Sequence, residues 1–218
     1  MHYLQDLWNS LNFNSVLDVV LRLVSVFLCL TVHETCHGLA ALALGDPTAK
    51  QQHRLSLNPL RHIDWLGLGM MVFAGFGWAK PVPVNPSYFK KPKQGMALTA
   101  LAGPVSNFIL AFLLILLARL VLPGALESAW MENLFFFLIE TAGLSIGLGL
   151  FNLVPIPPLD GSKVLFALLP DKQYAVLMRY EHLGFILLFL LVALDVGSGW
   201  INHAIQTVFN FFYQIVFI

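Results

Sequence analysis

Charged residues are scarce in this sequence. Only 11% of its 218 residues are Asp, Glu, Lys or Arg, whereas 58% are hydrophobic, and the mean hydropathy is +0.76. Soluble domains typically carry about 25% charged residues. The composition therefore excludes an ordinary soluble domain and predicts an integral membrane protein that lies in a lipid bilayer.

An excess of charge of either sign is also missing. Twelve basic and twelve acidic residues give a formal net charge of zero. The overall charge therefore offers no attraction to a polyanion, and nucleic acid is not an expected partner.

The sequence has only two cysteines, Cys29 and Cys36. Seven positions on one predicted helix separate their Cα atoms by about 10 Å. Because a disulfide requires Cα atoms closer than about 7 Å, an intramolecular bridge is excluded. Cys36 stays open as a metal ligand, since it lies next to two histidine positions of the same helix.

Long apolar runs predict an all-α polytopic membrane fold with about five transmembrane helices. They are expected at residues 15–44, 95–122, 130–153, 174–194 and 199–218. The stretch from Trp65 to Trp78 is apolar but short and rich in glycine, which favours a re-entrant hairpin or loop between the first two helices. A loop that lies on the lipid headgroups is the alternative.

The chain is expected to form one transmembrane domain with three parts. Residues 1–14 lack the basic region and small-residue cleavage site of a signal peptide, and their mixed pattern predicts an interfacial segment. Residues 15–170 form the predicted catalytic core, and residues 171–218 the C-terminal helices.

The first predicted helix contains His33, Glu34 and His37. Residues i and i+4 of a helix lie on the same side, so the two imidazoles can face one metal ion while Glu34 reaches its bound water. This His-Glu-x-x-His spacing is typical of zinc hydrolases. Because ionisable groups inside a bilayer cost about 2.5 kcal/mol or more, three of them within five residues indicate a shared task.

Charge placement predicts the topology and a third ligand. Ten of the twelve Lys and Arg residues lie within residues 50–93 and 163–179. By the positive-inside rule, both regions are cytoplasmic and the N-terminus is outside. The same arrangement brings the end of the first helix and Asp160 to one side of the membrane. Asp160 is therefore a candidate zinc ligand, although alone its position after three prolines favours a helix N-cap.

The sequence resembles the site-2 protease family of intramembrane zinc metalloproteases, in its compact prokaryotic form. The likeness extends from about residue 25 to 170. It rests on His33-Glu34-Thr35-Cys36-His37, on the stretch Asn152–Gly161, and on shorter motifs at 45–48, 57–59, 77–86 and 102–107.

The resemblance implies a role for each site residue. His33, His37 and Asp160 would bind one Zn²⁺ per chain, Glu34 would be the catalytic acid and base, and Asn152 would hold the substrate near the metal. It also implies a chain without a PDZ or CBS domain. Cys36 and His53 depart from the pattern that is usual in the family.

The predicted function is that of an intramembrane zinc metalloendopeptidase. Its substrates would be transmembrane proteins or peptides, cleaved in or near their membrane segments. The expected location is a prokaryotic cell (inner) membrane, with the active site toward the cytoplasm. A metal-ion transporter would more often show internal repeats, and a non-catalytic zinc-binding membrane protein would not need Glu34 between the histidines; both remain as alternatives.

Overall fold

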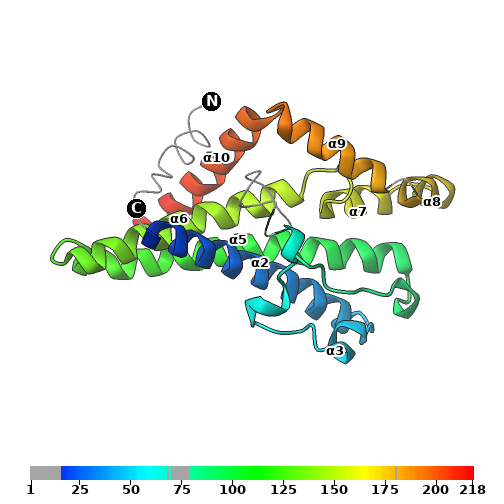
Figure 1. Ribbon diagram of the computed structural model, residues 1–218, viewed down its shortest axis with the longest axis horizontal. Coiled ribbons are helices and arrows are strands. Elements are labelled where there is room, and N and C mark those ends of the chain that lie inside the picture. Colours follow the sequence, from blue (N-terminus) through cyan, green and yellow to red (C-terminus); the bar gives the residue numbers. More distant parts are fainter. Residues whose placement is uncertain (1–15, 68, 70–78, 180) are drawn as a thin grey trace.

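The computed structural model describes residues 16–67, 69, 79–179 and 181–218 (Figure 1). Within these ranges the protein is helical and contains no β-strand. The prediction of an all-α fold is therefore confirmed. The predicted interfacial segment at residues 1–14 lies outside the described residues, as does most of the predicted hairpin between Trp65 and Trp78.

Three long apolar helices confirm the first three predicted spans. They are α2 (Val16–Ala43), α5 (Pro92–Ala125) and α6 (Ala129–Asn152). Gly45 follows the end of α2 and has a φ of +107°. Glycine adopts such a left-handed conformation without strain. Helix α5 extends beyond the expected end at residue 122 and continues through Pro123. Proline fits a helical φ and removes only one hydrogen bond there.

The C-terminal part is helical, as predicted. After the short α7 (Asp160–Ala167), the helices α8 (Asp171–Arg179) and α9 (Glu181–Ala193) cover the expected helix at 174–194 except for residue 180, which lies outside the described residues. Together with α10 (Ser198–Phe217), which bends away from it by 86°, α9 could form a fourth, broken span. A count of five spans stays a prediction.

The long helices pack around one apolar core. Figure 1 shows α5 and α6 side by side along the length of the molecule, with α2 against them; α10 packs on α6 and α5. The buried core residues come from α5, α6 and α10: Ala111, Leu114, Ile115, Ala118, Leu138, Ala142, Ile146, Ile205 and Val216. This core lies beside the polar residues of α2 and does not include them.

The first half of α5 buries small and polar side chains. The exposed face of the helix carries large apolar residues such as Ile109, Leu113 and Leu120, whereas Gly103, Ser106 and Asn107 are buried. Small residues at buried positions let membrane helices approach closely. The inward face of α5 therefore has both the room and the polar groups that a site needs.

A buried carboxylate connects the end of α2 to the loop that follows it. Asp46 is 0% exposed. Its Oδ1 accepts hydrogen bonds from the backbone N–H and the hydroxyl of Thr48, the first residue of α3 (Thr48–Gln51). Its Oδ2 accepts a hydrogen bond from the backbone N–H of Asn85 at 2.7 Å. Asn85 in turn precedes the 3-10 helix η2 (Pro86–Tyr88). Asp46 therefore fixes the segment before η2 against α2.

We predict that Asp46→Asn lowers the free energy of unfolding by about 2 kcal/mol, because the amide nitrogen cannot accept a hydrogen bond from Asn85. Burial raises the pKa of the Asp46 carboxyl, but hydrogen bonds from Thr48 and Asn85 more than offset this and leave the pKa below its ordinary value. The wild-type stabilisation is therefore complete above the unfolded pKa of about 3.9 and is lost as the pH falls through the folded pKa.

The measurement is thermal unfolding in detergent at a series of pH values. Asp195→Asn, at an exposed turn position, is the control and should unfold like the wild type. Equal unfolding temperatures for Asp46→Asn and the wild type at neutral pH would contradict this role of Asp46.

Candidate metal centre

The two histidines of α2 face each other inside the protein. His33 and His37 are only 3% and 8% exposed, and their rings meet edge to face with centroids 4.5 Å apart. Their Nε2 atoms are 3.0 Å apart. The helical i, i+4 spacing therefore directs two nitrogen donors to one point, as the sequence predicted.

Asp160 reaches the same point from α7. Its Oδ2 lies 3.1 Å from Nε2 of both His33 and His37, and the residue is 7% exposed. The helix starts at Asp160 with Leu159 as its N-cap residue, and no side chain caps it. The N-cap alternative for Asp160 was therefore wrong, because the carboxylate faces the imidazoles instead of the free N–H groups of its helix.

The three donor atoms fit the size of a zinc ion. They form a nearly equilateral triangle with sides of 3.0, 3.1 and 3.1 Å. Zinc bonds of about 2.0–2.1 Å in tetrahedral geometry place ligand atoms about 3.3 Å apart. Two nitrogens and one carboxylate oxygen also form a donor set typical of catalytic zinc.

Two carboxylates lie near the histidine pair. The donor atoms of His33, Glu34 and His37 all lie within 4.8 Å of one another, and Asp160 Oδ2 lies 3.1 Å from Nε2 of each histidine. These two contacts make Asp160 the candidate third ligand, with Glu34 beside the same point. Cys36 is a half-buried free thiol outside this group of donors.

A backbone N–H fixes the Glu34 carboxylate. Val82 donates to Glu34 Oε2 at 2.9 Å, from an extended segment that follows the undescribed residues 70–78. Sequence reasoning missed this contact, because a backbone donor can belong to any residue. The segment around Val82 therefore decides where the carboxylate lies.

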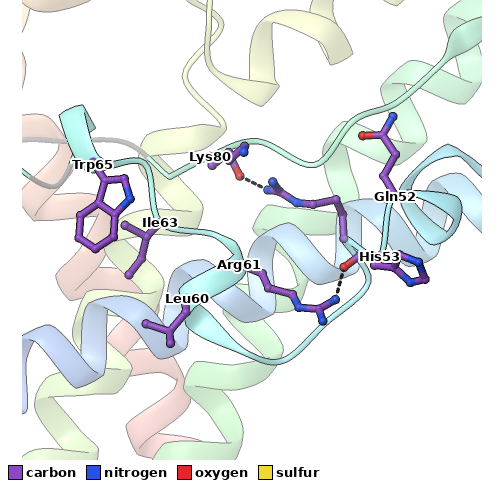
Figure 2. A pocket seen from close by; sticks show the side chains of 8 residues that line it. Gln52, His53, Leu60, Arg61, Ile63, Trp65 and Lys80 are labelled. Atoms are coloured by element: carbon purple, nitrogen blue, oxygen red, sulfur yellow. Dashed lines mark hydrogen bonds between the residues drawn. The ribbon is translucent and has the colours of Figure 1, made fainter.

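Arg54 holds that segment from the other side. Its guanidinium donates to the carbonyl oxygens of Lys80 at 2.8 Å and Pro81 at 3.3 Å. Figure 2 shows the Lys80 contact at the edge of a cavity of about 670 Å³ that Arg54, Arg61, Lys80 and Trp65 help to line. None of the candidate site residues lines this cavity. Arg54 thus acts on the site only indirectly, through the backbone that precedes Val82.

The second nitrogen of each imidazole contacts α5. His37 Nδ1–H donates to the backbone carbonyl of Thr99 at 2.7 Å, and His33 Nδ1 lies 3.2 Å from Nδ2 of Asn107. A proton on Nδ1 of His37 leaves its Nε2 free to bind a metal. Thr99 was not predicted, since a backbone carbonyl has no sequence signature.

Gly103 makes room for both imidazoles. A Cβ atom at this position would lie 2.5 Å from Cε1 and Nε2 of His37 and 2.6 Å from Cε1 of His33. Such distances do not occur between unbonded carbon or nitrogen atoms. Gly103 therefore lets α5 lie directly against the histidine rings.

Asn152 and Lys163 lie at the edge of the site. Asn152, at the end of α6, donates from its amide to the carbonyl of Leu148 at 2.9 Å, so that part of its amide is bound to its own helix. The ammonium of Lys163 lies 3.9 Å from Asp160 Oδ1, the oxygen not directed at the histidines. His53 and His62, which lie in the basic stretch at residues 50–93, are not in the site.

Comparisons with known proteins agree with this geometry. The sequence model described as peptidase family M50 matches residues 121–194, a range that includes Asp160 but not the histidines. YwhC of Bacillus subtilis (strain 168) is 41% identical over 177 residues, which cover 80% of this chain and 81% of that protein. The chain belongs to peptidase family M50.

Two more distant relatives support the assignment. Rip2 of Mycobacterium tuberculosis (strain ATCC 35801 / TMC 107 / Erdman) is 30% identical, over 85% of this chain and 70% of that protein. MJ0611 of Methanocaldococcus jannaschii is 31% identical, over 69% of this chain and 72% of that protein. All three relatives are named as zinc metalloproteases. No solved structure matches the chain.

This M50 peptidase is thus a zinc metalloendopeptidase of the site-2 protease family, as the sequence motifs indicated. Its metal is Zn²⁺, and its three long apolar helices make it an integral membrane protein. His33, Glu34 and His37 form a group whose donor atoms could hold a metal ion.

We predict that Gly103→Ala weakens Zn²⁺ binding at least tenfold, because the added methyl group pushes both imidazoles away from their shared point. Gly147→Ala is the matched control: it is also a helix glycine, but its Cβ would meet only the side chain of Ile205, at 3.4 Å. Zinc dissociation constants from chelator competition provide the measurement. Unchanged zinc affinity in Gly103→Ala would show that the rings do not depend on this glycine.

Proposed function

We propose that this metalloprotease cleaves peptide bonds in or near the transmembrane segments of other membrane proteins. The observation that carries the proposal is the triangle of His33, His37 and Asp160 donor atoms. Its two histidines lie on α2, an apolar helix of membrane-spanning length, and Asp160 reaches them from α7. Gly103, Thr99 and Asn107 of the long apolar helix α5 lie against the histidine rings. A site in this position reaches substrates that themselves lie in the bilayer.

In this proposal His33, His37 and Asp160 hold one zinc ion, and Glu34 moves the proton. Zinc lowers the pKa of a bound water and polarises a carbonyl group. The Glu34 carboxylate, held by the Val82 N–H, takes a proton from the attacking water and passes it to the departing amine. Asn152, next to the loop that leads to Asp160, would hold the substrate backbone.

The proposed location is a prokaryotic inner membrane, with five passes and the site toward the cytoplasm. His33 and His37 lie in the C-terminal half of α2, and basic residues are concentrated in the loop that follows. The positive-inside rule assigns that end to the cytoplasm. Water would then reach the site from the cytoplasmic face, since His37 is only six residues, or about 9 Å, from the end of the helix.

We predict that Glu34→Gln keeps Zn²⁺ but lowers turnover by about 10²–10⁴-fold, because the three ligands remain and only the proton carrier is lost. The measurements are zinc content and cleavage of transmembrane peptides in liposomes. Proteomics of membrane peptides from cells with either form would identify natural fragments. Zinc loss with retained cleavage would reverse the roles assigned to Glu34 and the ligands, and full zinc without any cleavage by the wild type would favour the transporter alternative.

We predict that Asp160→Asn weakens zinc binding and lowers turnover by orders of magnitude while the fold survives, since the amide lacks the negative charge of the carboxylate. Cys36→Ser is the control, and its activity should stay within a few-fold of the wild type. If zinc content fell in Cys36→Ser and not in Asp160→Asn, the thiol would replace the carboxylate as third ligand.

A further inference from the structure

A buried amide lies against the metal site and has no assigned task. Asn107 is 0% exposed and lies on α5, one turn after Gly103. Its Nδ2 is 3.2 Å from His33 Nδ1, and its Oδ1 has no hydrogen-bond partner among the residues that the structure describes. Ser145 of α6 donates to the backbone carbonyl of Asn107 at 2.8 Å, so the contact between α5 and α6 does not need the side-chain amide.

The contact with His33 is informative because an imidazole has two different nitrogens. A nitrogen that binds a metal must offer a lone pair, which leaves the ring proton on the other nitrogen. If His33 Nε2 faces zinc together with His37 Nε2 and Asp160 Oδ2, then His33 Nδ1 carries the proton. The Asn107 side chain beside it must then accept a hydrogen bond from His33 Nδ1–H. Of the two ends of an amide, the oxygen accepts hydrogen bonds and the nitrogen does not.

The Asn107 side chain meets this requirement by a half-turn of its amide. The turn exchanges Oδ1 and Nδ2, two atoms of nearly equal size, at constant shape. No hydrogen bond holds Oδ1 in its present position. In the present orientation, the amide nitrogen donates to His33 Nδ1, and the ring proton lies on Nε2, which donates to Asp160 Oδ2 at 3.1 Å. In the turned orientation, the amide oxygen accepts a proton on Nδ1, and Nε2 is free to bind zinc.

We infer that Asn107 is a positioning residue of the zinc site: its amide oxygen accepts the Nδ1–H of His33 and directs Nε2 of that ring to the metal. The inference rests on the proposed metal site. The carbonyl of Thr99 does the same for His37, so each imidazole is oriented by one group of α5. Partners of this kind commonly contribute 10–100-fold to metal affinity.

The test compares zinc dissociation constants and apo-protein unfolding temperatures of Asn107→Leu, Asn107→Asp and the wild type. Leu fills similar space without an acceptor and should weaken zinc binding about 10–100-fold. Asp restores an acceptor for the His33 Nδ1–H and should bind zinc within about threefold of the wild type or more tightly. Recovery by Asp is a result that a purely structural amide would not give.

Asn202→Leu on α10 is the matched control. Asn202 is also a buried asparagine whose Oδ1 has no partner, so its loss tests the general cost of removing such an amide. Zinc affinity should be unchanged in this variant, whatever its unfolding temperature. An equal loss of affinity in Asn202→Leu and Asn107→Leu would overturn the inference.

Three further outcomes decide the remaining cases. Wild-type zinc affinity in Asn107→Leu would overturn the role of Asn107 and leave the proposed zinc site intact. If Asn107→Leu does not fold, Asn107→Asp decides, since weak zinc binding in a folded Asp variant would also overturn it. Absence of zinc from the wild-type protein would instead overturn the metal site itself, and the role of Asn107 with it.

Discussion

The structure depends on one contact, in which two imidazole nitrogens and one carboxylate oxygen meet inside an apolar protein. Ionisable groups are costly at this depth unless they have partners, and here each of the three atoms lies 3.0–3.1 Å from the other two. The contact joins α2 to α7, over 127 positions of sequence. In the proposed site, a zinc ion would bind all three atoms and offset this cost.

Helix α5 adapts the surrounding protein to this contact. It provides the space at Gly103, the carbonyl of Thr99 for His37, and the amide of Asn107 for His33. The loop after α2 fixes the remaining group, since the Val82 N–H binds Glu34. In the proposed site, α5 therefore contacts the two imidazoles, and the segment around Val82 contacts the Glu34 carboxylate.

The sequence predicted the parts of this site that depend on local spacing. His33, Glu34 and His37 follow from helix periodicity, and Asp160 follows from the placement of basic residues, which put it on the same side of the membrane. Backbone groups such as Thr99 O and Val82 N–H could not be predicted, because every residue has them. The first three spans were confirmed because the bilayer sets their length and polarity.

The central claim is that His33, His37 and Asp160 bind the metal through two nitrogens and an oxygen. X-ray absorption at the zinc edge of the purified protein measures this directly. The account predicts nitrogen and oxygen neighbours at about 2.0–2.1 Å with two histidine rings and no sulfur. A sulfur neighbour at about 2.3 Å would contradict it, because Cys36 is the one thiol beside the histidines in the sequence and would then have to take the place of Asp160.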